Sequence, residues 1–218
     1  MKKLSLLAAL LLCLGFLGGC CFSEETVMPP AAEYSEWNLI LVDASHSVPA
    51  DWDVTLVALR GGEQVDRRII DPLQAMFDAC RADGLLPIVY SGYRSQETQQ
   101  KIYDRNLAKN LADGYSAEEA EALTRQWVAV PGTSEHQLGL AVDVDSEDPD
   151  QCSDEAVWAW LLEHCAEYGF ILRYPADKTD VTGIGYEPWH FRYVGKEAAQ
   201  TIMSEGITLE EYLSQANN

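Results

Sequence analysis

Apolar and polar residues follow one another with two different spacings along the chain, beginning near residue 37. The short apolar runs 37–42 and 87–90 are rich in strand-favouring residues, so each predicts a β-strand, with 37–42 as the first. Residues 67–81 carry apolar side chains three and four positions apart, which is the spacing of an amphipathic helix. Gly84 follows shortly afterwards and predicts where that helix ends.

A long polar stretch, residues 96–127, has the composition of a helix rather than of a strand. Gly114 predicts a break within it. Ser116 then opens the second part, and Glu119 three residues later completes a capping box, in which each side chain bonds the backbone N–H of the other residue. The segment therefore predicts two helices in succession.

Strand and helix alternate again after residue 137. Large aliphatic residues occupy every second position of 138–144, which predicts a strand, and 190–194 predicts another. The intervening residues 154–168 have helical spacing. Strands and helices interleave without a regular βαβ repeat. This pattern predicts a single compact α+β domain, in which helices pack on a small antiparallel or mixed sheet.

The first 36 residues differ in character from the rest of the chain. Two lysines precede the apolar run 4–17, which is too short to cross a bilayer comfortably and has the layout of a secretory signal peptide. The run ends in Leu-Gly-Gly-Cys20, which resembles a bacterial lipobox, whose cysteine is lipidated; ordinary signal cleavage is the alternative. We expect a lipoprotein signal peptide at 1–19, an anchor cysteine with a flexible linker at 20–36, and the functional domain at 37–218.

Acidic residues outnumber basic residues by 35 to 15, which gives a net charge of −20. A surface this acidic repels phosphate backbones, so the charge argues against nucleic-acid binding. No two cysteines form a Cys-x-x-Cys pair, so a cysteine zinc site is not expected. Cys152 and Cys165 form either a disulfide or two reduced thiols, and both states are compatible with the sequence.

Two of the four histidines lie in the most unusual segments of the chain. His136 begins a run that reaches Asp143, and His190 lies in an aromatic segment with Glu187 and Arg192. Two imidazoles and a carboxylate suit zinc and leave the fourth tetrahedral position open for water, as a catalytic site requires. Spacing alone is weak evidence, because a His-x6-Asp pair is more often a solvated turn than a metal site, and a histidine in an aromatic strand is usually a hydrogen-bonded core residue. We expect Arg192 to be structural and to pair with an acid near the site.

Three motifs follow one another along the chain. They are Ser91-Gly-Tyr-Arg94-Ser, Ser134-x-His136-x-x-Gly139-x-Ala141-x-Asp143 and Glu187-Pro-Trp189-His190-x-Arg192-Tyr193. In kind, order and separation they resemble the VanY-like zinc D-alanyl-D-alanine carboxypeptidase family, and the resemblance extends over about residues 37–195. It implies one Zn²⁺ on the sheet of the domain, with His136, Asp143 and His190 as its ligands.

The resemblance also implies roles for residues around the metal. Glu187 is the implied general base, which deprotonates the metal-activated water and then protonates the leaving amine. Arg94 is the implied partner of a substrate carboxylate or of the oxyanion in the transition state. Ser134 and Gln99 match positions that bind the substrate, although a glutamine on a polar helix is equally compatible with a solvated surface position.

The implied reaction is removal of the C-terminal D-Ala from peptidoglycan stem peptides. The lipobox-like sequence adds the expectation of an extracytoplasmic, lipid-anchored protein, and we expect a monomer. An L,D-carboxypeptidase acting on tetrapeptide stems would use the same metal centre and stays an alternative. Another alternative, from a different class, is a non-catalytic zinc-binding module that recognises the cell wall, and the presence of Glu187 argues against it. A penicillin-binding serine peptidase is disfavoured because the chain has no Ser-x-x-Lys.

Overall fold

The computed structural model describes residues 37–216, all of which belong to one compact unit, Ser35–Asn218. The expected signal peptide, the anchor Cys20 and the linker up to residue 36 lie outside the described residues. Within 37–216, no helix combines the length and the apolar composition that crossing a bilayer requires.

The main sheet has four antiparallel strands in the order β3-β4-β6-β5. The strands are β3 (Pro87–Ser91), β4 (Ala141–Ser146), β5 (Phe170–Leu172) and β6 (His190–Tyr193). A separate two-stranded sheet pairs β1 (Leu56–Ala58) with β2 (Gln64–Asp66). The expected α+β class is confirmed, and the sheet is antiparallel.

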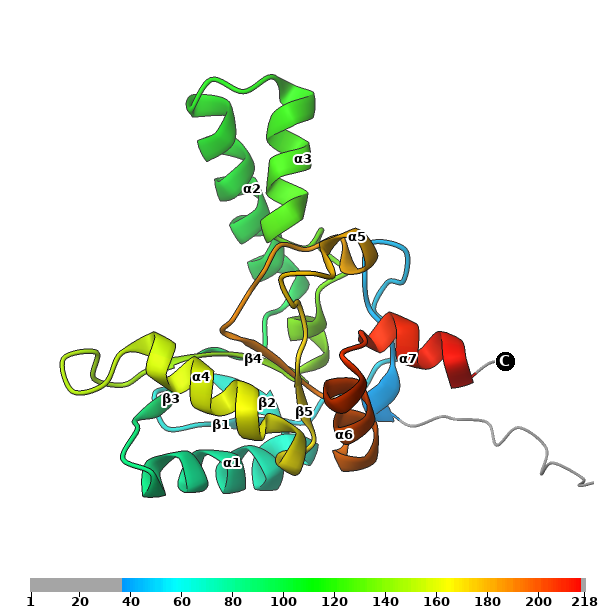
Figure 1. Cartoon of the computed structure of the whole chain (residues 1–218). Helices are drawn as coiled ribbons and strands as arrows, with labels where there is room; N and C mark the ends of the chain where they lie inside the picture. The colour runs from blue at the N-terminus through cyan, green and yellow to red at the C-terminus, as the bar shows by residue number, and fades with distance from the viewer. Residues whose placement is uncertain (1–36, 217–218) are drawn as a thin grey trace, which may run out of the picture. The chain divides into compact units, whose positions relative to one another are not determined.

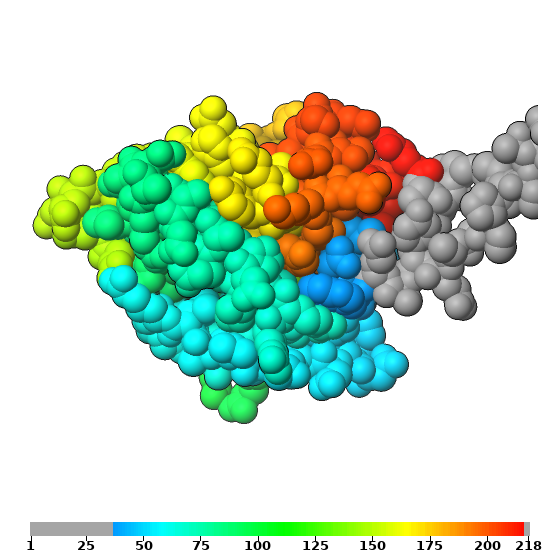
Figure 2. All heavy atoms as spheres, turned by 90° about the horizontal axis from the view of Figure 1, so that it is seen from below, coloured from blue at the N-terminus to red at the C-terminus, as the bar shows by residue number. Residues whose placement is uncertain are grey.

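Two helices, α1 (Ile70–Ala82) and α4 (Asp154–His164), cover one face of the main sheet and lie side by side in the view from below (Figure 2). Their buried residues form one hydrophobic cluster with Val142 and Val144 of β4. Side chains alternate along a strand, so Asp143 between these valines faces the opposite side of the sheet. The core therefore lies on one side of β4 and the candidate ligand on the other.

The opposite face of the sheet is partly covered by the last two helices, α6 (Lys196–Glu205) and α7 (Leu209–Ala216). They form a second hydrophobic cluster around Ile171 of β5. Asp143 on β4 pairs directly with His190 on β6, and cross-strand partners share a face. Both candidate ligands thus face away from α1 and α4.

A helical hairpin, α2 (Gln96–Ala112) and α3 (Ala117–Trp127), extends away from the sheet (Figure 1). The break between its helices contains Gly114, whose φ of 97° favours glycine. Ser116 and Glu119 form the expected capping box at the start of α3. The two helices predicted for this stretch are therefore confirmed.

The expectation that 37–42 is the first strand is wrong. Trp37–Leu39 is a 3₁₀ helix, η1, and the following residues up to 42 pair with no strand. The Arg192 guanidinium explains the difference, because it donates hydrogen bonds to the carbonyls of Asn38 and Ile40. These carbonyls are satisfied by a side chain and need no strand ladder.

The strand expected at 138–144 begins later, at Ala141. Glu135–Leu138 is a second 3₁₀ helix, η3, which ends at Gly139 with a φ of 71°. All residues of 138–144 are buried, both the large aliphatic ones and those between them. The alternation therefore indicated a buried segment, but it did not locate the start of the strand.

The two predicted core helices are confirmed, each with a 3₁₀ turn at one end. A 3₁₀ helix, η2 (Arg67–Ile69), precedes α1, and another, η4 (Cys165–Tyr168), follows α4. The short helix α5 (Thr179–Thr182) completes the described elements. Cys152 and Cys165 are free thiols, which is the second of the two states compatible with the sequence.

Candidate metal centre

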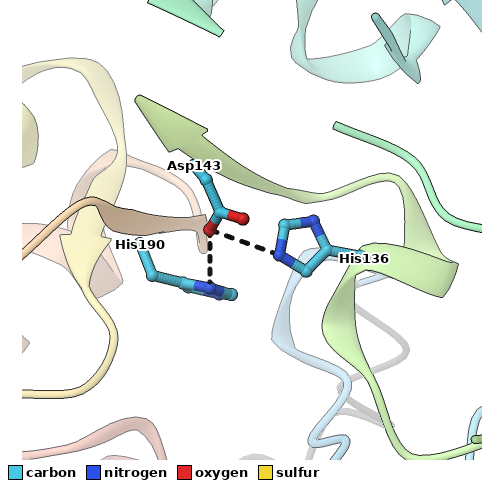
Figure 3. Close-up of side chains that lie close together, drawn as sticks. All are labelled: His136, Asp143 and His190. Atoms are coloured by element: carbon cyan, nitrogen blue, oxygen red, sulfur yellow. Dashed lines mark ion pairs between the residues drawn. The ribbon is translucent and has the colours of Figure 1, made fainter. Parts of the chain in front are cut away.

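His136, Asp143 and His190 lie together on the sheet face opposite α1 and α4 (Figure 3). Asp143 comes from β4, His190 from β6 and His136 from η3. All three side chains are buried, and one ligand atom from each lies within 4.8 Å of the others. Three separate elements thereby present three metal-ligating atoms to one point.

The nitrogen that each histidine turns toward Asp143 is identified by its distance. His136 Nε2 lies 3.3 Å and His190 Nδ1 lies 3.1 Å from Asp143 Oδ1 (Figure 3). Neither contact completes a hydrogen bond of good geometry, so this buried oxygen has no hydrogen-bond partner among the described residues. Two imidazole nitrogens that converge on an unpaired carboxylate oxygen fit a catalytic zinc site with three protein ligands.

The second nitrogen of each imidazole faces an oxygen that can orient the ring. His136 Nδ1 lies 2.7 Å from the Gly92 carbonyl oxygen, which can only accept, so Nδ1 carries the proton and Nε2 is free to bind a metal. His190 Nε2 lies 3.6 Å from Glu135 Oε2, and neither atom has a hydrogen-bond partner among residues 37–216. Glu135 Oε2 is therefore placed to accept a hydrogen bond from His190 Nε2.

Two glycines of the sequence motifs make this backbone arrangement possible. A Cβ at Gly92 would lie 2.2 Å from the Gln64 carbonyl oxygen, so only glycine lets the chain approach β2 this closely. Gly139 has a positive φ of 71°, and a Cβ there would lie 2.9 Å from the Asp66 nitrogen. Both glycines are thus required by backbone packing around His136.

Glu187 is buried beside the ligands, with Oε2 at 3.5 Å from His190 Nδ1. Burial raises the pKa of Glu187 to about 7, although the adjacent His190 opposes the rise. For Asp143, burial also favours a raised pKa, but His136 and His190 outweigh it and hold the pKa well below the usual range. Asp143 thus stays ionised, as a carboxylate that binds a metal must, while Glu187 is suited to exchange a proton near neutral pH.

Arg94 enters the site from the loop that follows β3. Its Nη2 lies 2.5 Å from Asp143 Oδ2, and its Nε donates to Ser91 Oγ at 2.8 Å. Arg94 therefore holds the outer oxygen of Asp143 and leaves Oδ1 facing the imidazoles. The guanidinium has five N–H donors, so donors beyond these two are available to a ligand.

One pocket of about 460 Å³ contains all seven residues that the sequence interpretation assigned to the site. Ser134 and Gln99 line it and are almost fully buried. Gln99 is therefore not a solvated surface residue. Its Nε2 donates to the Ala129 carbonyl at 2.8 Å, and its Oε1 has no hydrogen-bond partner in the described part of the chain.

Glu135 is the residue near the metal centre that the sequence interpretation missed. Its fully buried Oε1 accepts hydrogen bonds from Arg173 Nε at 2.8 Å and from Arg192 Nη1 at 2.9 Å. Burial favours a raised pKa for Glu135, but the two guanidinium groups outweigh it and lower the pKa. The expectation that Arg192 pairs with an acid near the site is confirmed. The sequence did contain one indication of Glu135. Arg192 lies in an otherwise apolar strand, and a buried arginine requires a carboxylate partner, but the sequence does not say which carboxylate it is.

Comparison with known proteins gives a consistent assignment. The sequence profile of the family described as VanY, D-alanyl-D-alanine carboxypeptidase, matches residues 62–196. A D-alanyl-D-alanine carboxypeptidase of Enterococcus faecalis (strain ATCC 700802 / V583) is 51% identical over 194 residues, which cover 88% of this chain and 72% of that protein.

Solved structures are similar as well. VanYB in complex with D-alanine-D-alanine has a TM-score of 0.80 and 53% identity, covering 82% of this chain and 98% of the other. A mutant of the vancomycin resistance D,D-pentapeptidase VanY in complex with Zn(II) has a TM-score of 0.78 and 52% identity, with coverages of 81% and 99%. The LdcB LD-carboxypeptidase is less similar, with a TM-score of 0.67, 35% identity and coverages of 80% and 84%.

Proposed function

Because the chain belongs to the VanY D-alanyl-D-alanine carboxypeptidase family, we propose how its own residues carry out that reaction. The enzyme is a zinc-dependent metallo-carboxypeptidase that removes the C-terminal D-Ala of peptidoglycan stem peptides. The observation that carries the assignment of roles is the position of Glu187. It is buried 3.5 Å from the His190 nitrogen that faces Asp143.

His136 Nε2, Asp143 Oδ1 and His190 Nδ1 are the atoms that would hold the zinc ion. When bound, zinc supplies a Lewis acid that polarises the scissile carbonyl and lowers the pKa of a water molecule. Glu187 takes a proton from the attacking water and delivers it to the amine of the departing D-Ala. A carboxyl group whose pKa is raised by burial can both accept and release that proton near neutral pH.

Arg94, Ser134 and Gln99 position the peptide. Arg94 lies beside the ligand Asp143 and has free donors, so it suits the terminal carboxylate of the substrate or the oxyanion of the transition state. Ser134 and the unpaired Oε1 of Gln99 line the same pocket and can bond the peptide's polar groups. All of these residues come from one chain, so we propose that the enzyme acts as a monomer.

A preference for the D,D bond over the L,D bond is supported by the higher identity to the D,D-pentapeptidase, 52% against 35% for the LD-carboxypeptidase. Purified protein is incubated with pentapeptide and tetrapeptide stems, and the products are measured by mass spectrometry. We expect one D-Ala to be released from the pentapeptide, the resulting tetrapeptide to persist, and chelation to stop the reaction. Conversion of tetrapeptide to tripeptide as the faster reaction would instead identify an L,D-carboxypeptidase. Binding without any cleavage would indicate a recognition module.

We also propose that the enzyme is anchored to the outer side of the cell membrane by lipid on Cys20. The support is the sequence Leu-Gly-Gly-Cys20 after the apolar run. Cys20→Ser should move the protein from the membrane fraction to the soluble fraction without changing its specific activity, because the metal centre lies in a separate part of the chain. Cell fractionation followed by an activity assay measures both quantities. Unchanged membrane retention would contradict the anchor.

A further inference from the structure

A second arginine lines the substrate pocket, farther from the metal centre than Arg94. Gln99, Ile102 and Arg105 of α2 are three residues apart and all line the pocket, so they lie along one side of the helix. Gln99 is buried and Arg105 is exposed, so this row leads from the inner part of the pocket outward. At 1.5 Å per residue, Arg105 lies about 9 Å farther along α2 than Gln99.

Arg105 differs from the neighbouring cations in its lack of an ion pair among the described residues. Lys101, Lys109 and Arg125 on the same hairpin each pair with a carboxylate of the hairpin, and Arg94 pairs with Asp143. Arg105 makes no ion pair with any residue between 37 and 216. In a chain with a net charge of −20, most of the described lysines and arginines form an ion pair with a carboxylate. A guanidinium in the substrate pocket that pairs with no described carboxylate is available to an anionic group of the ligand.

We propose that Arg105 binds a carboxylate of the stem peptide on the amino-terminal side of the scissile bond, and so favours stems that carry this charge. The inference rests on the proposed carboxypeptidase function. In the proposed reaction the scissile bond lies at the metal ligands beside Arg94, whether Arg94 binds the terminal carboxylate or the oxyanion, so the preceding residues of the peptide leave along the pocket. An extended peptide spans roughly 3.3–3.6 Å per residue. A distance of about 9 Å corresponds to two or three extended residues, so the second or third residue before the scissile bond lies beside Arg105.

The surroundings of Arg105 suit a peptide side chain that ends in a carboxylate. Ile102 and Trp127 line the same pocket and offer apolar surface. The Trp127 ring packs closely against Gly185, where an added Cβ would lie 2.8 Å from two ring atoms. An apolar wall can cover the aliphatic part of the substrate side chain, while the guanidinium binds both carboxylate oxygens.

The proposal is tested with pairs of peptides that end in D-Ala-D-Ala and differ only by glutamate or glutamine. The exchange is placed at the first or at the second residue before D-Ala-D-Ala. We expect the wild type to favour a glutamate peptide in kcat/KM by roughly 3- to 10-fold. Arg105→Gln should lose this preference through a higher KM for the glutamate peptide alone, and Arg105→Lys should retain part of it. Lys196→Gln is the matched control, because it removes the same charge from α6, outside the pocket.

Two results would overturn the anion site: equal losses on both peptides in Arg105→Gln, or a preference that Arg105→Gln leaves intact. The same peptide pairs are titrated calorimetrically with each protein, so the affinity comparison decides the question even if no peptide is cleaved. Failure of the wild type to release D-Ala from any peptide would contradict the carboxypeptidase function instead. The two failures are therefore distinguishable.

Discussion

A Glu187→Gln variant is expected to lose about 10²–10⁴-fold in kcat on a pentapeptide stem, the usual contribution of a general acid–base group. Glutamine keeps the length and hydrogen-bonding capacity of the side chain but cannot accept the proton of the attacking water. KM should change little, because Arg94 and Ser134 are untouched. Steady-state kinetics of D-Ala release measures both constants.

Asp145→Asn is the matched control for this prediction. Asp145 lies two residues after Asp143 on β4, and therefore on the same face of the strand, but it is not among the residues that line the pocket. Its amide variant should keep most of the turnover. Near-normal turnover in Glu187→Gln, with the control also unaffected, would show that Glu187 is not the general base.

A Glu135→Gln variant is expected to lose about 3–5 kcal/mol of the free energy of unfolding, the usual cost of breaking a buried ion pair from one side. Arg173 retains Glu210 as a partner, but Arg192 retains only backbone carbonyls. Both guanidinium groups are fully buried, so water cannot replace the lost carboxylate. Denaturant unfolding followed by tryptophan fluorescence measures the loss.

Glu210→Gln provides the comparison for Glu135. Glu210 also pairs with Arg173, but its side chain is partly exposed at 15%, against 0% for Glu135. Glu210→Gln should therefore lower the free energy of unfolding clearly less than Glu135→Gln does. An unfolding midpoint of Glu135→Gln equal to that of the wild type would contradict a stabilising role for this network. Because the pKa of Glu135 is lowered on folding, its contribution is complete above the unfolded pKa near 4.5 and declines as the pH falls below that value.

The metal ligands could be predicted because they lie in short local motifs, His136 and Asp143 in one and His190 in another. Two imidazoles and a carboxylate suit zinc, but the resemblance of these motifs to the family, and not their spacing alone, favoured a metal site over a solvated turn. The helical hairpin was predictable for a similar reason, since Ser116 and Glu119 carry their own capping signal. The direct pairing of Asp143 with His190 was not predictable, because strand register depends on the whole sheet.

The missed features depend on contacts between residues far apart in the sequence. The segment 37–42 has strand-like composition, but Arg192, more than 150 positions later, bonds its carbonyls. Glu135 has no local signal because its partners, Arg173 and Arg192, lie on other elements. The strands β1 and β2 have only three residues each, too few for a period of two to stand out.

The most direct test of the zinc centre is the metal content of the purified Glu187→Gln protein beside that of the wild type and His136→Ala. The same preparations used for the kinetics are analysed by mass spectrometry of the metal. We expect about one zinc per chain in the wild type and in Glu187→Gln, since three protein ligands suffice for a catalytic site, and loss of most zinc in His136→Ala. A zinc-free wild type that is fully active, or His136→Ala with undiminished zinc, would contradict the assignment of this centre.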